Sequence, residues 1–95
     1  MAKYRIMYWQ EIPSVVEARE GREKAKTQLS LRFQELIDLI AMRRKLDGAD
    51  EYLLHWSKGD WQTCEGSAES AVKRVAGELE AEYETIKAAA LEKMT

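Results

Sequence analysis

The chain has 95 residues, of which 45% are hydrophobic and 34% charged, and its formal net charge at pH 7 is -2. This length is typical of one small domain, and we take residues 1–95 as a single domain. The charge excludes a strongly basic nucleic-acid module, and no apolar run approaches the roughly 20 residues of a membrane span. With one cysteine and no secretory signal, we expect a reduced, cytoplasmic domain without internal disulfides.

The first segment has the two-residue period of a β-strand, from Lys3 to Ile12. One face carries Tyr4, Ile6, Tyr8 and Ile12, and the other carries Arg5, Met7, Trp9 and Glu11. Because proline has no N–H to donate, we expect a turn at Pro13–Ser14. A shorter antiparallel strand follows over 15–19. The charged residues 20–27 are interpreted as an exposed loop or as an extension of the strand edge.

The period becomes helical between Leu31 and Leu46, with Ser30 as the predicted N-cap. The apolar stripe of this helix is Phe33, Leu36, Ile37, Ile40 and Ala41. A second, short helix is expected from Asp50 to Gly59, and a third strand over 60–65. After a predicted N-cap at Ser67, the pattern favours one long helix from residue 68 to about residue 94.

These elements predict an α+β fold in the order β-β-α-α-β-α. A small three-stranded antiparallel sheet would pack with helices on one face.

Candidate catalytic chemistry is sparse. His55 is the only histidine and Cys64 the only cysteine, and no third residue is placed by its spacing to orient an imidazole. One His and one Cys are also too few for a structural zinc site unless carboxylates complete it. We therefore predict no catalytic residue, no metal and no cofactor, and we favour a non-catalytic protein over an enzyme.

Large aromatic side chains are numerous for so small a core. If helices cover one face of the sheet, Met7 and Trp9 lie on the other and form an aromatic surface for a partner. Tyr52, Trp56 and Trp61 complete the set of residues predicted to line an interface or a pocket. The alternative is that helices wrap both sides of the sheet and bury these rings.

Four segments of the chain form a recognisable set: Ile6–Pro13, the Leu-Ser-x-Arg-Phe start of the helix at Leu29–Phe33, the pair Ala41–Met42, and Asp50–Trp56. Together they resemble a family of small bacterial proteins known as virulence factors, a domain also found in a staphylococcal-type conserved virulence factor. The family name describes a phenotype, so the resemblance implies no catalytic residues. It also implies a link to folate and corrinoid one-carbon transfer, as an accessory subunit.

Two functions follow as expectations. The first is a non-catalytic protein-interaction or accessory module that uses the exposed aromatic surface to bind a protein partner or a second copy of itself. The second is a small-molecule-binding accessory subunit of a one-carbon system, with the same rings stacked on a flat conjugated ligand. A basic patch could be formed by Arg22, Lys24, Lys26 and residues 43–45, but nearby acidic residues offset its positive charge. We therefore expect no nucleic-acid partner and no membrane partner.

Overall fold

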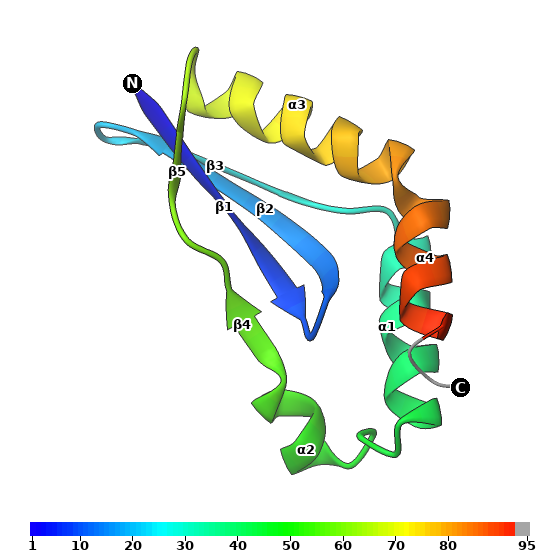
Figure 1. Cartoon of the computed structure of the whole chain (residues 1–95). Helices are drawn as coiled ribbons and strands as arrows, with labels where there is room; N and C mark the ends of the chain where they lie inside the picture. The colour runs from blue at the N-terminus through cyan, green and yellow to red at the C-terminus, as the bar shows by residue number, and fades with distance from the viewer. Residues whose placement is uncertain (93–95) are drawn as a thin grey trace.

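The computed structural model describes residues 1–92. Within this range the chain forms an antiparallel sheet of five strands and four helices (Figure 1). The strands are β1 (Ala2–Trp9), β2 (Ile12–Glu20), β3 (Glu23–Gln28), β4 (Trp56–Lys58) and β5 (Gln62–Cys64). The helices are α1 (Leu31–Arg43), α2 (Ala49–Leu54), α3 (Ala68–Ala81) and α4 (Tyr83–Glu92). The α+β class is therefore confirmed, whereas the predicted number of three strands is too small.

The sheet has the order β3-β2-β1-β4, and β5 also pairs with β1. The two short strands β4 and β5 lie along the same edge of β1 but contact different halves of it. β4 pairs with Met7–Trp9 and β5 with Ala2–Tyr4. The connection between β4 and β5 therefore runs beside the middle of β1.

The first hairpin turns earlier than the sequence predicts. The expected turn at Pro13–Ser14 is wrong, because the chain reverses at Gln10 and Glu11, and Gln10 takes a left-handed φ of 52°. Pro13 is tolerated in β2 because β3 pairs only with Val15–Glu20. The N–H group that proline lacks is therefore not needed for hydrogen bonds between β2 and β3.

Two further segments differ from the predicted elements. Residues 23–28 are the edge strand β3, which agrees with the strand-edge interpretation and not with the loop. The predicted helix from Asp50 ends after Leu54, and Trp56–Lys58 is strand β4 instead. This strand has only three residues, and it exists because β1 offers an unpaired edge to them.

The predicted long helix is divided at Glu82 into α3 and α4, and its last two predicted residues lie outside the described range. The division lets α3 cross one face of the sheet while α4 packs beside α1 (Figure 1). No proline or glycine marks this position. Gly77 is not the site of a close crossing, since nothing lies within 4 Å of a Cβ placed there.

Glu80 ties α3 to the start of α1. The Ser30 amide and hydroxyl donate to its carboxylate at 2.6 and 2.7 Å, and Arg32 forms an ion pair with it at 3.1 Å. Ser30 is thus the N-cap, as predicted, but a carboxylate from α3 receives its hydrogen bonds. Burial raises the pKa of Glu80, but these hydrogen bonds and the Arg32 charge outweigh it, and the pKa lies below the ordinary 4.5.

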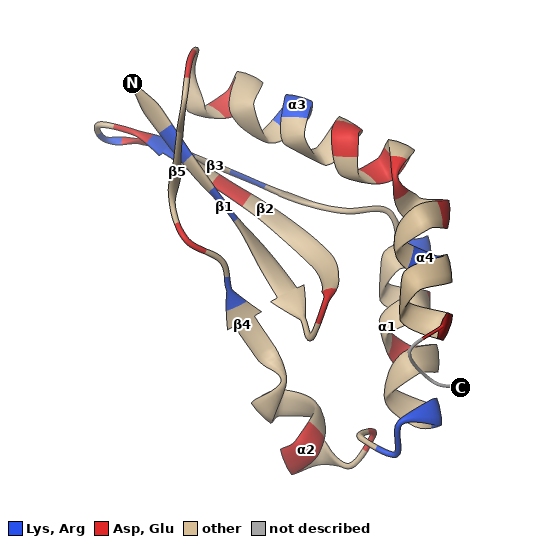
Figure 2. Ribbon diagram, viewed as in Figure 1, with Lys and Arg blue, Asp and Glu red and all other residues tan. Residues whose placement is uncertain are grey.

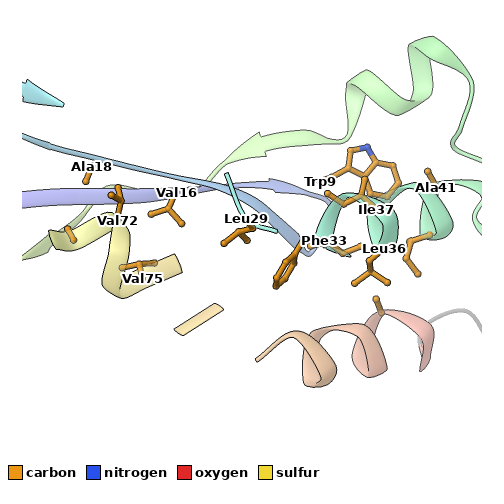
Figure 3. Packing of buried hydrophobic residues seen from close by; sticks show 14 of the residues in the cluster. Trp9, Val16, Ala18, Leu29, Phe33, Leu36, Ile37, Ala41, Val72 and Val75 are labelled. Atoms are coloured by element: carbon orange, nitrogen blue, oxygen red, sulfur yellow. The ribbon is translucent and has the colours of Figure 1, made fainter. Parts of the chain in front are cut away.

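One core joins the sheet to the helices. Val72 and Val75 of α3 lie toward Val16 and Ala18 of β2, and Trp9 packs against the same core on the side of α1 near Ile37 (Figure 3). All five residues predicted for the α1 stripe are buried. Among the described residues, no helix combines the length and apolar character needed to cross a membrane.

Candidate functional site

The face of the sheet opposite α3 is charged. The register pairs Arg5 with Glu17, Glu17 with Lys26, and Arg19 with Lys24. Directly paired residues point to the same face of a sheet, and side chains alternate along each strand. These five side chains therefore share one face, while the intervening residues of β2 point into the core.

The basic residues of the sheet are concentrated on one part of it. Figure 2 shows Lys and Arg on β1, β2 and β3 toward the β2–β3 hairpin, where some Glu also lie, and mostly Glu along α3 and its junction with α4. A chain of net charge -2 therefore presents a locally basic surface on the uncovered face of its sheet. Such a concentration of one sign attracts ligands of the opposite sign.

Trp61 lies on this basic face. It belongs to the connection between β4 and β5, which runs along β1. The guanidinium carbons of Arg5 and Arg19 are 4.3 and 4.5 Å from the centroid of its ring. Such cation–π contacts contribute about 0.5–1 kcal/mol each at exposed positions, so together they hold the half-buried ring against the sheet.

Gly59 allows the β4–β5 connection to approach β1 closely. Its N–H donates to the Ile6 carbonyl at 2.8 Å. A Cβ at this position would lie 3.2 Å from that carbonyl oxygen and 3.3 Å from the ring of Tyr8. Burial and the neighbouring Tyr4 raise the pKa of the Tyr8 hydroxyl, which therefore stays neutral near pH 7. The close approach of Gly59 positions Trp61 two residues later.

A groove of about 430 Å³ opens beside the Trp61 ring. Its charged lining consists of five cations and one carboxylate: Arg5, Arg19, Lys24, Lys26, Lys58 and Glu17. Arg5 and Glu17 form an ion pair at 3.3 Å. Within residues 1–92, the other four cations make no ion pair. The groove therefore carries four uncompensated positive charges and an aromatic ring, which suits an anionic ligand.

Trp9 belongs to a different, buried cluster. Its side chain is 0% exposed, its ring stacks on Tyr52 with centroids 5.6 Å apart, and its Nε1 donates to the Tyr52 carbonyl at 2.9 Å. The expectation that Trp9 lies on an exposed face is wrong, because α2 and β4 fold over this end of β1. Trp9 is therefore buried, although helices do not wrap both sides of the whole sheet.

The other predicted site residues are divided between the two places. Met7 is half-buried and pairs with Lys58, so it extends the basic face from the groove. Tyr52 and Trp56 contact each other edge to face at 5.9 Å in the Trp9 cluster. Of the five predicted residues, only Trp61 lines the basic groove.

Tyr52 also lines a second hollow, of about 570 Å³, between α1 and α2. Asp38, Ala41, Met42 and Asp47 form the rest of its wall, and Leu53 and Leu54 are exposed on α2. This hollow contains two carboxylates and no cation.

His55 and Cys64 lie near opposite ends of β1. The His55 ring is 5.8 Å from that of Trp9, whereas Cys64 pairs with Ala2. Seven residues of strand separate these two positions, or roughly 20 Å, so the two side chains cannot act as a nucleophile and its base. Among the described residues, no group of three or more His, Cys, Asp or Glu side chains is placed to hold a metal ion.

The cations of the groove were missed as a set, although their alternation is visible in the sequence. The basic patch considered from sequence combined residues 22–26 with residues 43–45, which lie at opposite ends of the molecule (Figure 2). Arg44 is moreover paired with Glu11 at 2.7 Å. Arg5, Arg19 and Lys58 could have been found only by recognising that β3 is a strand and that Trp61 folds back onto the sheet.

A family model described as virulence factor matches residues 7–92. The chain belongs to the virulence factor family. No curated protein and no solved structure matches it. In this virulence factor domain the family match includes Trp61, Arg19 and both lysines of β3, while Arg5 lies just before its first residue.

Proposed function

We propose that this virulence factor domain is a non-catalytic protein-interaction module that binds an acidic segment of a partner protein in the basic groove. The observation that carries the proposal is the set of four uncompensated cations around Trp61. Aromatic residues and arginine are also the types enriched at the centres of protein interfaces.

An acidic protein segment fits this site better than a nucleic acid. The chain as a whole is acidic, with a net charge of -2, so it lacks the extended basic surface that a long polyanion requires beyond the groove. A short acidic segment needs only the local positive charge of the groove. The cations of the groove are also confined to strands β1 to β4, with Trp61 on the β4–β5 connection.

A labelled oligoglutamate peptide tests the proposal. Its affinity for the intact chain is measured by fluorescence anisotropy at low and at high salt. Raising the ionic strength from about 0.01 M to about 1 M shortens the Debye length from about 30 to about 3 Å, so binding in the groove must weaken strongly.

Arg19→Glu should lower the affinity by about tenfold, which corresponds to about 1.4 kcal/mol. Arg74→Glu is the matched control, because it makes the same change of charge on α3, at an exposed residue outside the groove. Equal effects of the two variants would contradict a site in the groove. Tighter binding of a single-stranded oligonucleotide than of the peptide would contradict a protein partner.

The second candidate is a small-molecule-binding accessory subunit that takes a flat, conjugated anion. The volume of the groove, about 430 Å³, is in the range of small-molecule sites, and Trp61 offers an aromatic surface. The lining is mostly charged, whereas such sites are mostly apolar, so this candidate ranks second. A coloured or fluorescent compound that co-purifies with the wild type and is lost in Trp61→Ala would favour it.

A further inference from the structure

β3 is the outer strand of the sheet, and no described strand pairs with its other side. All six of its residues, Glu23–Gln28, pair with β2 through one edge only. The free edge borders the basic groove, since Lys24 and Lys26 belong to both. The groove and the free edge together form one continuous surface.

The register identifies the backbone groups that point to this free edge. The Leu29 N–H donates to the Ser14 carbonyl at 2.9 Å, one position beyond the paired residues Gln28 and Val15. In an antiparallel pair, residues that bond to the partner alternate with residues that point away from it. Odd-numbered residues of β3 therefore bond to β2, and the N–H and C=O groups of Lys24, Lys26 and Gln28 point outward.

Backbone and side chains at this edge favour the same ligand. The residues whose backbone groups point outward are also those whose side chains lie on the basic face. Lysines on an edge strand oppose pairing with apolar or basic strands. They do not oppose a strand with acidic residues directly across from them, because opposite charges stabilise cross-strand pairs.

We infer that the acidic segment of the partner binds in extended form and adds as an antiparallel strand to the free edge of β3, with alternate Asp or Glu side chains over Lys24 and Lys26. This inference rests on the proposed function and specifies how the same site recognises its partner. Main-chain hydrogen bonds hold the strand, and the alternating acids select it. The antiparallel direction continues the arrangement of the whole sheet.

Synthetic peptides test the inference. The probe alternates Glu and Thr, and its control contains the same residues grouped into two blocks, so both have the same charge. In an antiparallel addition, the glutamates that lie on the basic face also donate their N–H groups to β3. N-methylation of the glutamate amides should therefore weaken binding about fivefold to tenfold, while N-methylation of the threonine amides should leave it unchanged.

Amide hydrogen exchange gives a direct readout on the protein. In the free chain, the amides of Ala25 and Thr27 should be protected and those of Lys24, Lys26 and Gln28 should exchange quickly. The alternating peptide should slow the exchange of the latter three by about tenfold or more. Gln28→Pro removes an outward N–H without changing the charge, at an edge position that tolerates proline, and it should weaken binding of the peptide.

The outcomes separate this inference from the proposed function. Strand addition is overturned by three results together: equal binding of both peptides, no effect of N-methylation, and unchanged exchange of the β3 amides. The proposed binding of an acidic peptide would still stand in that case. If neither peptide binds, or if Arg19→Glu and Arg74→Glu bind equally well, the proposed function itself is contradicted. If Gln28→Pro does not fold, the N-methylated peptides still decide the question on the wild-type chain.

Discussion

Replacing Trp9 tests whether its cluster is structural or part of a binding surface. An aromatic side chain buries about 150–250 Å², which at about 25 cal/mol per Å² corresponds to about 4–6 kcal/mol. Because unfolded chains already bury some of this area, we expect Trp9→Ala to cost about 4 kcal/mol, within the usual range for such truncations. A domain of this size has a total stability of about 5–14 kcal/mol, so this variant should lose a large part of it.

Trp9→Phe separates the hydrogen bond from the packing. It keeps an aromatic ring but removes the Nε1 donor, and so leaves the Tyr52 carbonyl without this partner. Loss of a buried hydrogen-bond partner costs about 1–3 kcal/mol, and we expect about 2 kcal/mol in total. The assay is urea unfolding followed by far-ultraviolet circular dichroism.

Binding of the acidic peptide should not change in Trp9→Phe, because Trp9 does not line the groove. Both affinity and stability are therefore measured on the same preparation. The reasoning would be refuted if Trp9→Ala lowered the free energy of unfolding by less than about 1 kcal/mol and also abolished peptide binding. Trp9 would then be part of the binding surface.

Four other variants test particular positions in the structure. Glu80→Gln should cost about 1–2 kcal/mol at pH 7. The depressed pKa of Glu80 means that its stabilisation is present above the ordinary 4.5 and is lost as the pH falls below it, so unfolding of the variant should depend less on pH in this window. Gly59→Ala should lower the unfolding temperature, because the Ile6 carbonyl lies 3.2 Å from the new Cβ, whereas Gly77→Ala should raise stability by about 0.5–1 kcal/mol in an open helical position. Alkylation of Cys64 by iodoacetamide should proceed at the same rate in His55→Ala as in wild type; a slower rate in the variant would show that the two side chains interact.

Local patterns predicted the elements whose residues contact their own neighbours in sequence. The stripe of α1 follows a helical period, and its predicted core residues are buried. Ser67 caps α3 as predicted, and Ser70 completes the capping box. In both cases the deciding contacts lie within one or two turns of helix.

Elements that depend on distant partners could not be predicted in this way. β4 has three residues, and the unpaired edge of β1 decides its conformation. The division of the last helix depends on Glu80, which reaches the start of α1 some 50 residues away, and on the contact of Tyr83 with Phe33. Pro13 was given too much weight, because its effect depends on where β3 ends.

The candidate site follows the same rule. Trp61 was selected because large rings are rarely fully buried, and the structure places it in the groove. Trp9 was selected because strand alternation placed it on the face opposite the helices, but it lies in the core. The difference arises from α2, which covers Trp9 but leaves the other half of the sheet uncovered, and the sequence pattern alone contains no sign of that placement.

The most direct test of the central claim is a nuclear magnetic resonance titration of the isotope-labelled chain with the alternating acidic peptide. The indole N–H signals of Trp9, Trp56 and Trp61 report separately on the core cluster and on the groove. We predict that the Trp61 signal and the backbone amides of β3 shift together and saturate at the same peptide concentration, while the Trp9 signal stays in place. Shifts confined to Trp9, Trp56 and the amides of α2, with Trp61 unchanged, would contradict the account.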